Sequence, residues 1–133
     1  MRVFATKAFA RFARKERLHD KELCEAVARA ERGSIDAQLG GGLIKQRVAR
    51  HGGGRSGGFR TIIAYRASQQ SVFLYGFAKN ERENINEREL NDLKKLAKLF
   101  LSYSNSQIAA ALAQAELREV ICDDQETKSR QIS

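Results

Sequence analysis

The fold is decided by residues 43–79, which read LIKQRVARHGGGRSGGFRTIIAYRASQQSVFLYGFAK. Three runs of alternating or apolar residues, 43–50, 59–66 and 71–79, are typical of β-strands. A glycine-rich segment separates the first two runs, and a short polar turn separates the last two. Because a parallel crossover needs a dozen or more residues, connections this short predict an antiparallel meander.

Two amphipathic helices are predicted before these strands. Thr6 can cap the first helix, and the second begins near Asp20 and ends at Gly33. Apolar side chains recur at helical spacing in both helices, which favours their burial against the sheet. Residues 1–5, ahead of the first helix, are compatible with one further strand.

Two more helices are predicted after the strands. Asn86 with Glu89, and Ser104 with Gln107, have the spacing of capping boxes. The second of these helices is expected either to cover the core or to contact a partner protein. The chain is polar from about residue 123 onward, where a frayed end is expected.

The predicted organisation is a single α+β domain over residues 1–122, followed by a disordered tail over 123–133. Its helices span about 6–33 and 86–121, and its strands about 43–79. A small twisted antiparallel sheet is expected to pack against the two N-terminal helices, with the C-terminal helices after the sheet.

Positive charge is concentrated around the predicted strands. The formal net charge is +8, with fifteen Lys and Arg against six Asp and Glu up to Arg66, and nine against ten after it. Acidic residues are absent between Ala37 and Lys79, where seven cations lie: Lys45, Arg47, Arg50, Arg55, Arg60, Arg66 and Lys79. Such a segment is typical of polyanion-binding proteins, although a solvated basic face has the same composition.

Strand geometry predicts which of these cations meet. Side chains alternate across a strand, so Lys45 and Arg47 share a face. Arg60 begins the second strand, and in a meander the end of the third strand, with Lys79, lies beside it. Because like charges repel at short range, their convergence indicates an anion such as a phosphodiester between them.

Other classes of site are not predicted. Cys24 and Cys122 are far apart and match no zinc spacing, so reduced thiols are expected rather than a disulfide or a metal site. No apolar run approaches the roughly 20 residues of a membrane span, and the N-terminus lacks the apolar region of a signal peptide. The expectation is a cytoplasmic protein with no cofactor, no metal and no membrane contact.

Three segments of the strand region resemble one protein family when taken together. They are residues 42–50 (GLIKQRVAR), 55–60 (RSGGFR) and 73–82 (FLYGFAKNER). The chain resembles the RelE-like toxins of type II toxin–antitoxin modules, in particular the HigB branch of the RelE/ParE superfamily. The resemblance implies a microbial-RNase-like fold, ribosome-dependent endonucleolytic cleavage of messenger RNA and inhibition of translation. It also implies a cognate antitoxin, expected to be a helix-turn-helix DNA-binding protein.

The resemblance also implies which residues carry the chemistry. Members of the family use basic residues in place of a His/Glu pair, and the matching positions here are Lys45, Arg47, Arg60 and Lys79. We expect metal-independent attack of the ribose 2′-OH on the adjacent phosphate, with the arginines stabilising the transition state. Either lysine, or His51, would move the proton. The residues predicted to bind RNA are Arg50, His51, Arg55 and Arg82.

Two other functions remain open from the sequence. The ParE branch of the same superfamily poisons DNA gyrase without cutting RNA, although the concentration of cations in this chain argues against that activity. A non-catalytic nucleic-acid-binding or regulatory protein would carry a similar basic segment. In such a protein, neutralising each cation would weaken binding in small and similar steps.

Overall fold

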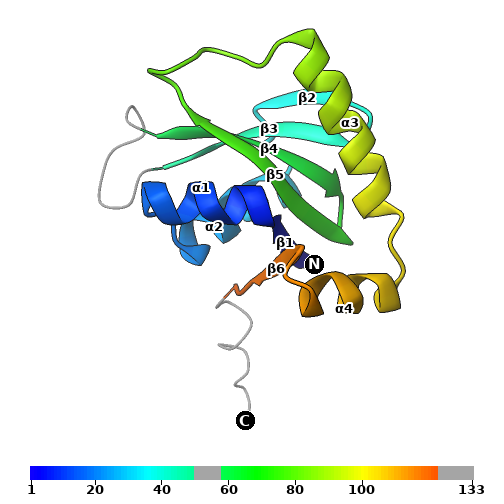
Figure 1. Cartoon of the computed structure of the whole chain (residues 1–133). Coiled ribbons are helices and arrows are strands. Elements are labelled where there is room, and N and C mark those ends of the chain that lie inside the picture. The colour runs from blue at the N-terminus through cyan, green and yellow to red at the C-terminus, as the bar shows by residue number, and fades with distance from the viewer. Residues whose placement is uncertain (50–57, 123–133) are drawn as a thin grey trace.

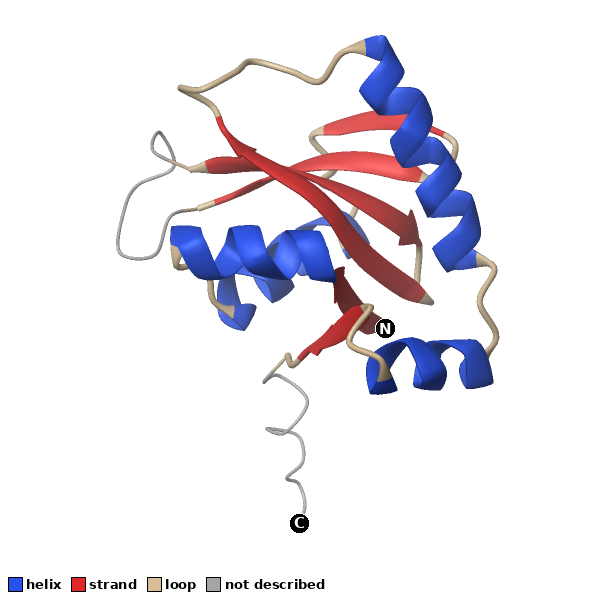
Figure 2. Cartoon of the chain, in the orientation of Figure 1, coloured by secondary structure: helices blue, strands red, loops and turns tan. Residues whose placement is uncertain are grey.

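A six-stranded mixed sheet with helices on both faces forms the molecule, as Figures 1 and 2 show. The computed structural model describes residues 1–49 and 58–122. Its strands are β1 (Arg2–Thr6), β2 (Ala37–Gly40), β3 (Leu43–Val48), β4 (Phe59–Arg66), β5 (Gln70–Ala78) and β6 (Leu117–Val120). Its helices are α1 (Lys7–Glu16), α2 (Asp20–Glu31), α3 (Glu87–Leu101) and α4 (Asn105–Ala113). The α+β class predicted from the sequence is confirmed.

The strand order is β2-β3-β4-β5-β1-β6. The meander predicted from the short connections is present, since β4 pairs antiparallel with both β3 and β5. The sheet is mixed rather than wholly antiparallel, because β1 pairs in parallel with β5. That pairing joins segments about seventy residues apart, for example Arg2 opposite Gln70, and no local pattern announces it.

The predicted caps fix the helix starts. Thr6 Oγ1 accepts a hydrogen bond from the Phe9 N–H at 3.1 Å and begins α1. Asn86 and Glu89 form the expected capping box of α3. Ser104 and its partner three residues on form the capping box of α4. These bonds satisfy backbone N–H groups that have no partner inside the helix.

Each face of the sheet has its own apolar core. On one face α1 and α2 pack against β-strand side chains, with the rings of Phe9 and Phe73 5.0 Å apart between centroids. On the other face Ile62 belongs to a cluster with Leu93 and Ala97 of α3. Burial of such side chains stabilises the fold by roughly 1.5–3 kcal/mol each. The sheet is therefore held rigidly from both sides.

A β-bulge in β5 redistributes its aromatic residues. Ile62 pairs with Tyr75, but the next residue of β4 pairs with Phe73, so one residue of β5 is left over. By strict alternation Phe73, Tyr75 and Phe77 would share one face. The bulge instead leaves Phe73 in the core under α1 and places Tyr75 against the cluster under α3.

The C-terminal part departs from the expectation of helix up to residue 121. The helix α4 ends at Ala113, and the chain then forms β6, which pairs antiparallel with β1. The segment is short and shows no periodicity, so its sequence does not indicate a strand. It forms because β1 would otherwise be an open edge, and because Leu117 and Val120 become buried there.

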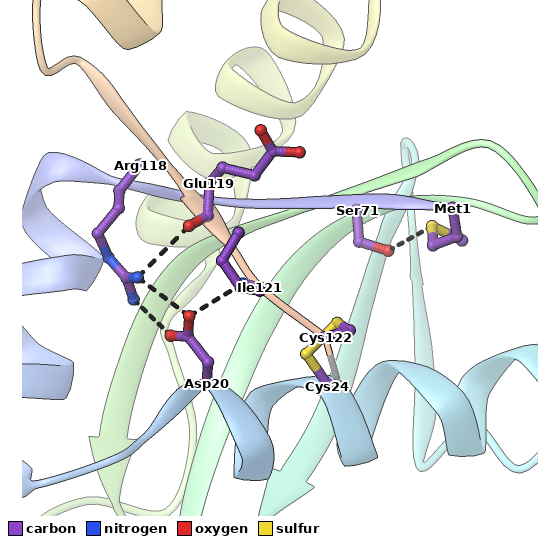
Figure 3. The surroundings of a disulfide bond; sticks show 8 residues. All are labelled: Met1, Asp20, Cys24, Ser71, Arg118, Glu119, Ile121 and Cys122. Carbon is purple, nitrogen blue, oxygen red and sulfur yellow. Dashed lines mark hydrogen bonds and ion pairs between the residues drawn. A yellow bond between two sulfur atoms is a disulfide. The ribbon is translucent and has the colours of Figure 1, made fainter. Parts of the chain in front are cut away.

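The expectation of two reduced cysteines is wrong. Cys24 of α2 and Cys122, just after β6, form a disulfide with a Cα–Cα distance of 5.6 Å, although 98 residues separate them in sequence. Asp20 reinforces this link, since its carboxylate accepts a bond from the Ile121 N–H at 2.9 Å and pairs with Arg118 at 3.0 Å (Figure 3). We call the Cys24–Cys122 disulfide, together with Asp20 and its bonds to Arg118 and Ile121, the β6 clasp. The sequence positions of the two cysteines gave no indication of the disulfide, because Cys122 approaches Cys24 only when β6 pairs with β1 in the folded protein.

Within the two described stretches of chain, no helix is long and apolar enough to cross a lipid bilayer.

Candidate functional site

The antiparallel register brings two of the predicted cations directly opposite each other. Arg47 of β3 pairs with Arg60 of β4, and Arg60 pairs on its other side with Phe77 of β5. Two residues along the strands, Lys45 lies opposite Ile62 on the same face. We call Lys45, Arg47 and Arg60 the basic sheet face. Like charges directly across a strand pair destabilise it, so this pairing favours a functional role over a structural one.

The basic sheet face lies on the side of the sheet that α3 covers only in part. Ile62, which pairs with Lys45, belongs to the core under α3. In Figure 1, however, α3 lies over the end of the sheet where β4 finishes, away from the end where β3 finishes and β4 starts. Arg47 is exposed there, with 44% of its side chain accessible, and Lys45 and Arg60 are half-buried. All three side chains are thus at least partly accessible to solvent.

Three of the four predicted catalytic cations have no neutralising partner among the residues that the structure describes. In residues 1–49 and 58–122 the side chains of Lys45, Arg60 and Lys79 form neither an ion pair nor a hydrogen bond. Arg47 Nε lies 3.9 Å from Asp36 Oδ2, and the same oxygen lies 3.9 Å from Arg29. Arg29 also lies 3.3 Å from Glu25, so two carboxylates face these two guanidinium groups and Asp36 partly compensates the charge of Arg47. Among the described residues, the uncompensated charge that the sequence predicts therefore resides on Lys45, Arg60 and Lys79.

Lys79 follows β5 in an exposed turn. It comes two residues after Phe77, the partner of Arg60, so the backbone places it at the same end of the sheet. Arg50, His51 and Arg55, which the sequence predicts to bind RNA, lie outside the residues that the structure describes.

Arg82 differs from the other cations because the protein already satisfies its guanidinium group. Its Nη1 and Nη2 atoms bind both carboxylate oxygens of Glu89, at 3.0 and 2.5 Å, and Nη1 also donates to the Tyr75 hydroxyl at 3.0 Å. Its Nε donates to the Asn84 carbonyl at 2.9 Å, and the group lies over the Phe77 ring at 5.6 Å. Arg82 thus ties the β5–α3 connection to the aromatic pair beside Arg60.

This anchor has a testable pH dependence. The hydrogen bond from Arg82 holds the pKa of Glu89 in the folded protein below its usual value. The ionised Glu89 carboxylate therefore stabilises the fold fully at pH values above its pKa in the unfolded chain. This stabilisation is lost as the pH falls through the lower pKa of Glu89 in the folded protein. Glu89→Gln is therefore expected to flatten the acid side of the stability–pH profile, measured by urea unfolding from neutral pH down to about pH 3. Glu87→Gln, in the same helical turn, serves as the control. Equal profiles for both variants would contradict the role given to Glu89.

Two residues that the sequence did not single out support the site. Gln46 is fully buried, and its side-chain oxygen accepts from the Asp36 N–H at 2.7 Å while its NH2 group donates to the Ala26 carbonyl at 2.9 Å. Asp36 in turn accepts from the Arg47 N–H at 2.7 Å. The sequence contained one signal of this network, because Gln46 alternates with apolar residues on the buried side of β3. A buried amide side chain must find hydrogen-bond partners.

A pocket of about 450 Å³ adjoins this network between α2 and β3. Arg29, Asp36 and Arg47 contribute to its walls. Arg47 therefore lies between this pocket and the basic sheet face. The chemistry offered by the whole arrangement is that of guanidinium forks, which match two phosphate oxygens at once, and of ammonium groups.

Comparison with protein-family models matches residues 1–120 of the chain to the RelE toxin of the RelE / RelB toxin–antitoxin system. The match begins before β1 and ends at the last residue of β6, so it contains every strand and every cation of the site. No curated protein matches the chain.

Proposed function

Because the chain belongs to the RelE toxin family, as a match over residues 1–120 shows, we propose that it is a ribosome-dependent endoribonuclease that cleaves messenger RNA. Toxins of this family generally cleave mRNA. The observation that carries the proposal is the basic sheet face, where Arg47 and Arg60 are direct cross-strand partners. In the described residues, the side chains of Lys45 and Arg60 form no ion pair. Such a face is suited to a phosphodiester whose charge increases during the reaction.

The proposed reaction is transfer of the phosphate to the neighbouring ribose oxygen. The 2′ oxygen forms a bond to phosphorus, the bond from phosphorus to the 5′ oxygen breaks, and the products are a 2′,3′-cyclic phosphate and a 5′-hydroxyl. Arg47 and Arg60 would hold the non-bridging oxygens, on which negative charge develops. A proton leaves the 2′-OH and a proton reaches the departing 5′ oxygen.

Two lysines are our candidates for moving these protons. Lys45 is half-buried within the basic sheet face, and Lys79 is exposed beyond β5. Lys45 shares its strand face with Arg47, so in this proposal it would lie nearer the phosphate that the arginines hold. Arg82 would act as a positioning residue, because its guanidinium is bound to Glu89.

Mapping of RNA ends in cells after induction tests the proposal. We expect new ends within coding regions of translated messages, and intact copies of a message whose start codon has been removed. Lys45→Gln should abolish most of these ends, whereas Lys95→Gln on α3 should not. Ends that are equally frequent in untranslated RNA would overturn the ribosome requirement. Intact messages accompanied by gyrase-dependent DNA breaks would instead support the ParE-type activity.

The remaining parts of the proposal follow from the same resemblance. We place the protein in the HigB branch, with a helix-turn-helix antitoxin, and in the cytoplasm, where its substrate is translated. Sequencing of the gene region and co-purification with the antitoxin test the branch.

A further inference from the structure

A groove with an apolar floor runs between α1, α4 and β6, at the edge of the sheet that β6 forms. Its volume is about 490 Å³. Its floor is formed by Ala10 of α1, Leu112 of α4 and Leu117 of β6, with Ala115 between the last two elements. Ala10 and Leu117 are buried, and Leu112 is half-buried. The last helix thus packs Ile108 into the core while Leu112 faces the groove.

One wall of this groove carries a row of three cations. Lys7, Arg11 and Arg14 all line it, and their spacing of four and three residues places them along one stripe of α1. All three are exposed, and within the described parts of the chain none of these side chains forms an ion pair or hydrogen bond. The first turn of α1 contains no acidic residue. The row is therefore a surface of net positive charge beside an apolar floor.

The opposite wall does not offset this charge. Arg118 is bound to Asp20 at 3.0 Å, and Glu119 is bound to Arg2 at 2.9 Å. Both wall residues are therefore neutralised within the fold. The β6 clasp also fixes this wall, because the disulfide follows it directly in sequence. The groove is a preformed surface whose charge remains on the α1 side.

We propose that this groove binds an acidic amphipathic segment of the cognate antitoxin. An apolar floor beside a one-sided cation row complements a segment with apolar residues on one side and Asp or Glu on the other. From Lys7 to Arg14 the stripe is roughly 10 Å long, which corresponds to about two helical turns. The proposal rests on membership of the family, which implies an antitoxin, and not on the proposed RNA cleavage.

RNA fits this groove less well than an acidic peptide does. The described residues that line it include no aromatic side chain on which a base could stack, and its floor is apolar. The groove also lies at the β6 edge of the sheet, and β5 and β1 separate β6 from the β4 strand of the basic sheet face. The antitoxin segment would therefore bind away from the site, and this contact would contribute affinity without itself covering the cations there.

Charge reversal with a matched control tests the proposal. Arg11→Glu/Arg14→Glu reverses two exposed cations of the groove, and Lys95→Glu/Lys98→Glu reverses two exposed cations of α3 with the same spacing. We expect the groove variant to bind the full-length antitoxin about tenfold more weakly or worse, and the α3 variant to bind within about twofold of the wild type. The titration uses the full-length toxin at two salt concentrations.

The outcomes separate this proposal from the proposed function. Equal antitoxin affinity for the two variants would overturn the groove proposal, and so would a greater loss in the α3 variant. If the groove variant kept its antitoxin affinity but lost binding to ribosomes, the groove would be an RNA-binding surface instead. RNA end mapping without antitoxin reports on cleavage independently, so a toxin that does not cut RNA still gives a valid titration.

Discussion

Arg60→Ala is expected to lower the rate of RNA cleavage by about 10²–10³-fold, the usual cost of removing one preorganised electrostatic donor. Arg60 is the central cation of the basic sheet face, with Arg47 on one side and Phe77 on the other. No acidic side chain in the described residues neutralises it, so its full charge is available to the phosphate. Single-turnover cleavage of a programmed ribosome would measure the loss.

The same substitution should leave the fold intact. Arg47 and Arg60 repel each other across the strand pair, and removing one of two opposed like charges relieves that repulsion. We therefore expect Arg60→Ala to have a free energy of unfolding equal to or slightly above that of the wild type. Loss of activity without loss of stability is the signature of a residue kept for function.

Two further variants make the result specific. Arg60→Lys keeps the charge but loses the planar fork, so an intermediate rate is expected. Arg66→Ala removes an arginine from the other end of β4, where the guanidinium donates to the Leu101 carbonyl at 2.9 Å. That variant should cost some stability but little of the cleavage rate. A fully active Arg60→Ala protein would remove Arg60 from the site.

The parts of the fold predicted from the sequence are those with local signals. The meander follows from short connections, and the helix starts follow from Thr6, Asn86 and Ser104, whose side chains accept bonds from N–H groups three residues on. Strand alternation and hairpin order, which depend on the sequence alone, predicted Lys45 and Arg47 on one face and Lys79 beside Arg60. The direct pairing of Arg47 with Arg60 depends on the strand register, which the glycine-rich sequence between the two strands does not specify.

The parts that were missed depend on contacts between distant segments. The bulge in β5 moves Tyr75 to the side of Arg60, and strict alternation places it with Phe73. Asp36 reaches Arg47 only because buried Gln46 holds its segment in place. The pairing of β1 with β5 and β6 likewise joins the ends of the chain to its middle. Such contacts arise from packing, which no short stretch of sequence encodes.

Removing the Cys24–Cys122 disulfide is expected to have the largest effect on stability. Its two cysteines are 98 residues apart, and in the chain-entropy description a loop of about 100 residues contributes about 4–5 kcal/mol, with measured values usually about 2–4 kcal/mol. Small domains have a total stability of about 5–15 kcal/mol. Cys24→Ser/Cys122→Ser should therefore lower Tm by about 10 °C. The variant should also become insensitive to added reductant.

The loss should not be uniform over the molecule. The β6 clasp holds an edge strand of four residues. Without the disulfide, β6 stays attached through its ladder with β1, the ion pairs of Arg118 with Asp20 and of Glu119 with Arg2, and the burial of Leu117 and Val120. In the disulfide-free variant, β6 amides should exchange hydrogen faster by a larger factor than β4 amides, which lie in the sheet centre. Asp20→Asn should add to this local opening, because it removes the charge that pairs with Arg118.

If hydrogen exchange became faster by the same factor in all strands, or did not change in β6, the disulfide would act only by restricting the unfolded chain. Local opening has a wider consequence, since Arg118 and Glu119 form one wall of the groove beside α1 and Leu117 is part of its floor. Disulfides persist in oxidising surroundings and are reduced in most cytoplasms. If the disulfide is needed to keep this wall in place, adding reductant should lower the antitoxin affinity of the wild type. The affinity of Cys24→Ser/Cys122→Ser should not change with reductant. One titration with and without reductant therefore tests both the disulfide and the groove.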